Sequence, residues 1–162
     1  MSDTSWHPSE YYIQPQDIYP FQSLEAFKRK RKRYWDAAWT RALQRWGPVG
    51  LSLEYRTGPK ARFPCEVSVE VVDIPPGIGA WAAYYPEPPN VPPDGAFIQV
   101  DVTTWQNALA SNNIGPLTRV ITHEVGHILG FGHGGNGIMA APPTVNAPNA
   151  EEIAAAKAYW GT

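Results

Sequence analysis

The residues from 123 to 133 read HEVGHILGFGH and contain three of the four histidines in the chain. The stretch from 117 to 130, which follows the breaker NNIGP, is expected to be a helix. Residues four apart on a helix share a face, so His123 and His127 should project side by side. Two imidazoles placed in this way could bind the same Zn²⁺ ion. Glu124 would project about 100° away around the helix axis, where it could reach a water molecule without being a ligand.

Gly130 is expected to end this helix, because glycine readily adopts the left-handed conformation that terminates helices. The turn would bring His133 round as a third ligand. Three neutral imidazoles leave the fourth position of a zinc ion open to water, as in catalytic zinc sites. We therefore expect His123, His127 and His133 to bind one catalytic Zn²⁺ ion. His7, the remaining histidine, is interpreted as an ordinary side chain.

This arrangement predicts a hydrolase. Zinc lowers the pKa of its bound water towards about 7, and a nearby carboxylate can take the proton as the water attacks a carbonyl. Glu124 is expected to be that general base and to pass the proton to the leaving nitrogen. A peptide bond fits this chemistry best. We expect a polypeptide substrate, aligned by main-chain hydrogen bonds to an edge strand at 80–85.

The motif HExxHxxGxxH followed by a methionine turn resembles the metzincin zinc metalloproteases, and its flanks look most like the matrixin (matrix metalloprotease-like) branch. The methionine turn is NGIMA, residues 136–140, which we call the Met-turn. The resemblance implies that Met139 lies beneath the metal as a hydrophobic floor and is not a ligand. EEIAAAKAYWG at 151–161 is similar to the closing helix of matrixins.

The resemblance also implies where a substrate binds. WAAYYP resembles the matrixin edge strand, and the residues after the Met-turn would form a wall of the pocket for the residue that follows the scissile bond. The substrate-binding residues expected on this basis are Ala82, Ala83, Tyr84, Ala141 and Pro142.

Matrixins usually hold a second, structural zinc ion, and here the sequence departs from them. The matching positions are Ala83 and Ile98, so this zinc is predicted to be absent. Calcium stays open: Asp94, Gly95 and Asp101 could supply oxygen ligands, but a plain loop is the alternative. Cys65 lacks the PRCGxPD context of the matrixin latency cysteine and is interpreted as a half-buried structural thiol.

The apolar pattern predicts the elements that would position these residues. The expected fold class is α+β and zincin- or metzincin-like. It has a twisted, mostly parallel sheet of four or five strands with an antiparallel edge strand, three helices, and a small C-terminal lobe with the Met-turn. Helices are expected at 24–46, 117–130 and 151–160, and strands at 51–55, 65–74, 80–86 and 95–102. Asn149 and Glu152 are expected to form a capping box at the start of the last helix. The first 21 residues are interpreted as an extended arm on one catalytic domain, 22–162, with an upper lobe at 22–130 and a lower lobe at 131–162.

The composition excludes several other classes. The chain has 162 residues, is 43 % hydrophobic and 17 % charged, and carries a formal net charge of −2. We expect one compact domain, a monomer, with no nucleic-acid partner and no membrane span. The basic run KRKRKR at 28–33 is either a solvated helix face or a contact for a polyanion. No signal peptide is visible at the N-terminus, whereas the family resemblance suggests a secreted protein.

Two alternatives to a peptidase remain open. The first is a non-catalytic binding or assembly module that keeps zinc for stability, with the arm and the basic run as docking surfaces. Glu124 counts against it, because a purely structural zinc site needs no base. The second is hydrolysis of a non-peptide amide by the same zinc-bound water.

Overall fold

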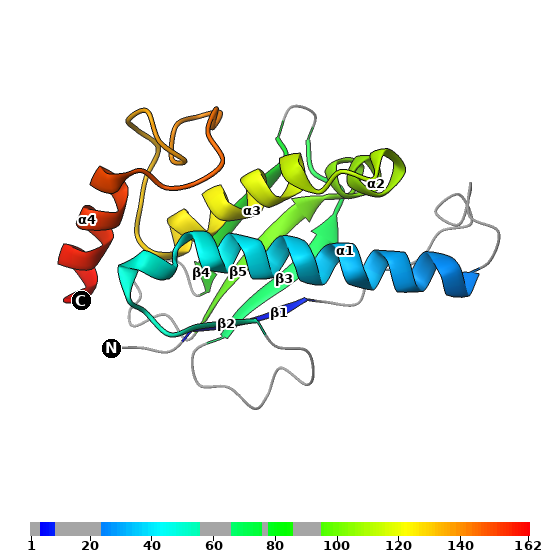
Figure 1. Ribbon diagram of the computed structural model, residues 1–162, viewed down its shortest axis with the longest axis horizontal. Helices are drawn as coiled ribbons and strands as arrows, with labels where there is room; N and C mark the ends of the chain where they lie inside the picture. Colours follow the sequence, from blue (N-terminus) through cyan, green and yellow to red (C-terminus); the bar gives the residue numbers. More distant parts are fainter. Residues whose placement is uncertain (1–3, 9–23, 56–65, 76–77, 86–94) are drawn as a thin grey trace.

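The computed structural model describes residues 4–8, 24–55, 66–75, 78–85 and 95–162. In this part of the chain, five strands form one sheet in the order β2-β1-β3-β5-β4 (Figure 1). Three neighbouring pairs are parallel, and β4 pairs with β5 in the antiparallel direction. The strands are β1 (Thr4–Pro8), β2 (Leu53–Tyr55), β3 (Glu66–Val72), β4 (Ala80–Tyr85) and β5 (Gly95–Asp101).

The period-two pattern expected for the fourth predicted strand is present in β5. Ile98 and Val100 are both fully buried, and they pair with Val69 and Val71 of β3. Alternate residues of a strand point to the same face. This face of the sheet therefore contributes directly to the hydrophobic core.

The four α-helices are α1 (Leu24–Arg45), α2 (Val102–Ser111), α3 (Gly115–Ile128) and α4 (Ala150–Trp160), and a short 3-10 helix, η2, spans Gly47–Val49. Helices α1 and α3 pack side by side over one face of the sheet (Figure 1). The apolar stripe of α1 is buried at Trp35, Ala38, Trp39 and Ala42, and Trp46, the residue directly after α1, is buried as well. Within the described residues, no helix combines the length and the apolar character needed to cross a membrane.

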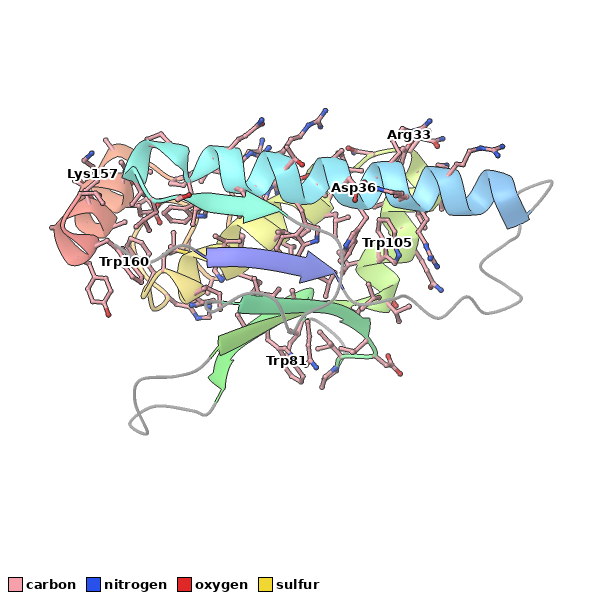
Figure 2. All side chains as sticks on the ribbon, turned by 90° about the horizontal axis from the view of Figure 1, so that it is seen from below. Arg33, Asp36, Trp81, Trp105, Lys157 and Trp160 are labelled. Atoms are coloured by element: carbon pink, nitrogen blue, oxygen red, sulfur yellow. The ribbon has the colours of Figure 1, made fainter. Side chains whose placement is uncertain are left out.

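The two faces of the sheet differ in their surroundings. Trp81 of β4 lies on the side away from α1 (Figure 2), is 39 % exposed, and its indole N–H donates to the side chain of Gln99. Trp105 of α2 is on the helix side and packs edge-on against Trp35, with ring centroids 5.1 Å apart. The large buried aromatics of the described core therefore lie between the sheet and its helices.

The fold class expected from the sequence is wrong as it was stated. It required three helices, whereas the described residues alone form four α-helices. Helix α2 was missed because it begins at Val102, directly after the last residue of β5, with no breaker between them. The first three residues of the helix, Val102-Thr103-Thr104, are β-branched and therefore favour continuation of the strand.

The prediction of an arm lying on the domain is also wrong for residues 4–8. These residues form β1, which is an interior strand of the sheet between β2 and β3. Thr4 pairs with Leu53, and Trp6 pairs with Val67. The apolar pattern of residues 4–8 alone does not predict pairing with strands that are distant in the sequence. The rest of the predicted arm lies outside the described residues, as does Cys65.

Candidate metal centre

Helix α3 carries the first two histidines of the motif. Its buried face includes Leu117, Ile121 and Val125, which orient the helix against the core. His123 is 5 % exposed and His127 is half-buried. Their Nε2 atoms lie 3.2 Å apart, as expected for side chains spaced by four residues on one helix face.

The chain turns back immediately after α3. Gly130 has φ of 110°, a conformation that glycine adopts without steric cost, and the amide of Phe131 donates to the carbonyl of Gly126 at 3.0 Å. This turn brings the exposed His133 to the two helix histidines. Its Nε2 atom lies 3.1 Å from those of both His123 and His127.

The outer nitrogens of the two helix histidines fix their tautomers. The Nδ1 atom of His123 lies 2.6 Å from the carbonyl oxygen of Ile138, and that of His127 lies 2.8 Å from the carbonyl oxygen of Phe131. A carbonyl can only accept, so both Nδ1 atoms must carry the proton and donate it. In the neutral rings, Nε2 then presents a lone pair, and no proton lies between these two Nε2 atoms. Lone pairs that converge in this way repel one another, and a cation bound between them would remove the repulsion.

The spacing fits a tetrahedral metal ion. Bonds of about 2.0–2.1 Å to imidazole place ligand nitrogens about 3.3–3.4 Å apart, close to the 3.1–3.2 Å found here. The three predicted ligands could therefore hold a metal ion, and the described part of the chain contains no other histidine, cysteine or carboxylate cluster of this kind.

Burial keeps the helix histidines ready to bind a metal. It lowers the pKa values of both His123 and His127, and the hydrogen bonds to backbone carbonyls only partly oppose that shift. A lowered pKa favours the neutral ring, the form that coordinates metals.

Glu124 lies beside this cluster in an unusual environment. Its side chain is 5 % exposed, and its Oε2 atom is buried without a hydrogen-bond partner among the described residues. Burial raises the pKa of this carboxyl to about 7. A buried carboxyl oxygen without a hydrogen-bond partner lowers the stability of the fold, so its presence needs an explanation, and a catalytic role would provide one. A carboxyl with this pKa could exchange a proton near neutral pH.

A pocket of about 360 Å³ opens next to the histidines. Among the predicted substrate-binding residues, Ala141 and Pro142 line it together with His123, Glu124 and His133. Ala82 instead packs against the core, and the side chains of Ala83 and Tyr84 lie outside the described set. The remaining lining residues are Ile78, Gly79, Ala80, Val120 and Pro143.

Met139 packs closely against α3. It is 2 % exposed, and its sulfur would lie 2.2 Å from a Cβ atom on Gly126, between the two helix histidines in sequence. The indole of Trp46, the residue directly after α1, approaches the same point at 2.9 Å. The Met-turn and Trp46 thus both contact the backbone between His123 and His127, and only a glycine at position 126 leaves enough space for them.

Glu152 was not foreseen as part of this region. The pattern predicted its capping box with Asn149, and that box is present in α4. The same carboxylate also accepts hydrogen bonds from the amides of Ile138 and Met139, both at 2.9 Å. A Cβ on Gly137 would lie 1.8 Å from Glu152 Oε1, so that glycine gives the carboxylate access to the Met-turn.

The open question of calcium concerns residues near α2. The Oδ1 atom of Asp101 accepts a hydrogen bond from the amide of Ile74 at 3.1 Å, so this oxygen already has a structural partner. Asp94 lies outside the described residues.

No family model and no curated protein match this chain. Solved structures do match it, and one is described as the GM1-bound form of the ECX AB5 holotoxin. That match covers 90 % of this chain but 57 % of the other, with 15 % identity and a TM-score of 0.43. A likeness this weak assigns neither a fold nor a function, and it gives the metzincin-like fold class no support.

Proposed function

We propose that the protein is a zinc-dependent endopeptidase in which Glu124 is the general base. One observation carries this proposal: three Nε2 atoms lie within 3.1–3.2 Å of one another, and two of these histidines, His123 and His133, line a pocket together with a buried carboxyl that has no partner among the described residues. A structural metal site has no use for that carboxyl. A hydrolytic site needs one.

Zinc is the metal that best suits this ligand set. Three imidazole ligands, two of them with Nδ1 held by a backbone carbonyl, are typical of zinc sites that keep one position open. When bound, Zn²⁺ supplies Lewis acidity, polarising a substrate carbonyl and lowering the pKa of water. His123, His127 and His133 would hold it, and the two carbonyls of Ile138 and Phe131 would orient the helix histidines.

Glu124 moves the proton. Its Oε2 atom, which has no partner among the described residues, accepts a proton from water in the pocket as that water attacks the substrate carbonyl. The protonated carboxyl then donates to the amide nitrogen as the C–N bond breaks. A cation on the neighbouring histidines would favour the carboxylate form, so the base is available at neutral pH.

An extended polypeptide is the substrate that the surroundings favour. Strand β4 is at the end of the sheet order, and the residues at its start, Gly79 and Ala80, line the pocket. An edge strand offers main-chain groups to a peptide added alongside it. The sequence resemblance to metzincins at HExxHxxGxxH and Met139 points in the same direction.

The proposal is tested with a library of peptides and a denatured protein as substrates. Purified protein loaded with zinc should cut them, a chelator should stop cleavage, and added zinc should restore it. Failure of the zinc-loaded protein to cut any peptide would overturn the peptidase proposal and favour a zinc-stabilised binding module. Cleavage of small amides alone would show a different substrate class.

A further inference from the structure

A single peptide group connects a carboxylate on α4 to a metal ligand on α3. The amide of Met139 donates to Glu152 Oε2 at 2.9 Å. The carbonyl of the same peptide unit, that of Ile138, accepts from His123 Nδ1 at 2.6 Å. The order is therefore carboxylate, peptide N–H, peptide C=O and imidazole N–H.

Helix capping explains only one of the three hydrogen bonds that the Glu152 carboxylate accepts. Its Oε1 atom accepts from the amide of Asn149 at 3.0 Å, which completes the capping box, and from the amide of Ile138. The Oε2 atom is not needed for the cap and bonds to Met139. The residue is only 9 % exposed, so its carboxylate makes these hydrogen bonds largely away from solvent.

We propose that Glu152 is a positioning residue that strengthens His123 as a metal ligand through the Ile138–Met139 peptide group. This inference rests on the metal centre of the proposed function. The carboxylate pulls on the N–H of the peptide, which makes the carbonyl a stronger acceptor, because consecutive hydrogen bonds polarise one another. A stronger acceptor at Nδ1 holds the proton there and makes Nε2 more basic.

The effect resembles that of the carboxylates that commonly bond to zinc-bound histidines, with a peptide group inserted between the partners. Burial of Glu152 strengthens its electrostatic effect on the peptide group, because a charge in a medium of low dielectric constant interacts more strongly with its neighbours than a charge in water. Gly137 permits the approach, because a side chain there would collide with the carboxylate.

The test compares Glu152→Gln with Asn149→Ala. The first removes the charge with little change in shape. The second removes the side-chain cap, in which Asn149 Oδ1 accepts from the Glu152 amide at 2.9 Å, and leaves the bonds to the Met-turn. Zinc affinity is measured by competition with a chromogenic chelator, and the visible spectrum of the Co²⁺ form reports the ligand field. Melting of the metal-free proteins records the loss of stability.

We expect Glu152→Gln to lower zinc affinity by about 10–100-fold, the usual effect of outer-shell partners, and to shift the Co²⁺ spectrum. Asn149→Ala should lower the melting temperature while zinc affinity stays within about threefold of wild type. Equal affinities for Glu152→Gln and wild type, or equal losses in both variants, would overturn this inference alone. A wild type that binds no zinc would overturn the metal centre itself.

If Glu152→Gln does not fold, the wild-type protein still decides the matter. The inference requires His123 in the metal-free protein to carry its proton on Nδ1 at neutral pH, which ¹⁵N chemical shifts of the ring nitrogens measure. A proton on Nε2, or an equal mixture of tautomers, would contradict it.

Discussion

The sulfur of Met139 lies 2.2 Å from the position that a Cβ atom on Gly126 would occupy. Gly126 immediately precedes His127 on α3, so the Met-turn packs directly against the backbone between His123 and His127. Trp46 contacts the same place and donates its indole N–H to the carbonyl of Thr122 at 2.8 Å. The glycine in HEVGH is therefore a packing requirement and not a site of flexibility.

Gly126→Ala should destabilise the protein by about 1–3 kcal/mol, the usual cost of overpacking a core, because both Met139 and Trp46 would have to move. Urea unfolding of the metal-free protein measures the change. Gly47→Ala is the matched control, since a Cβ there meets no atom within 4 Å. Similar stabilities for the two variants would show that the contact at Gly126 is not tight in solution.

The pH dependence of stability tests the environment of Glu124. Burial raises its pKa from 4.5 to about 7 in the metal-free protein, so the folded state binds this proton more tightly than the unfolded state. The resulting stability is present below the unfolded pKa and is lost as the pH rises through 7. The loss is on the order of 3 kcal/mol.

The lowered pKa values of His123 and His127 act with the opposite sign, because the unfolded chain binds protons that the folded rings do not. Both wild type and Glu124→Gln contain these histidines, so the difference in stability between the two proteins cancels the histidine contribution and leaves that of Glu124. The free energy of unfolding of the variant, minus that of wild type, should grow on the order of 3 kcal/mol between about pH 4.5 and 7.5. A difference that does not change with pH would mean that the carboxyl is solvated.

Gly130→Ala tests the turn that delivers His133. Gly130 has φ of 110°, and an added Cβ would also lie 3.3 Å from the ring of Tyr159. We expect a loss of about 1–2 kcal/mol, the cost of a left-handed conformation for a residue with a Cβ, together with weaker zinc binding. Gly132→Ala, at an open position without positive φ, should be near neutral on stability. Equal effects of the two variants in unfolding experiments would contradict this reading of the turn.

The histidine cluster could be predicted because its geometry is local. The helix places His123 and His127 on one face. Gly130 was expected to form the turn after this helix, and it does so with a positive φ. The capping box of Asn149 and Glu152 is similarly local and is present. In each case, the interaction spans only a few residues, so spacing alone predicts it.

Most of the features that could not be predicted from the sequence depend on partners that are distant along the chain. Strand β1 is defined by its pairing with β2 and β3, about 50 or more residues away in the chain. The second role of Glu152 depends on amides 13 and 14 residues before it, and its local role already accounted for its presence. Helix α2 was hidden by the β-branched residues that follow β5 directly.

The most direct test of the account is cleavage by wild type and Glu124→Gln, each with its zinc content measured on the same sample. Peptide products are identified by mass spectrometry after digestion of a peptide library. The account predicts about one zinc per chain in both proteins and cleavage by wild type alone. Cleavage by zinc-loaded Glu124→Gln at the wild-type rate, or no cleavage by zinc-loaded wild type, would contradict it.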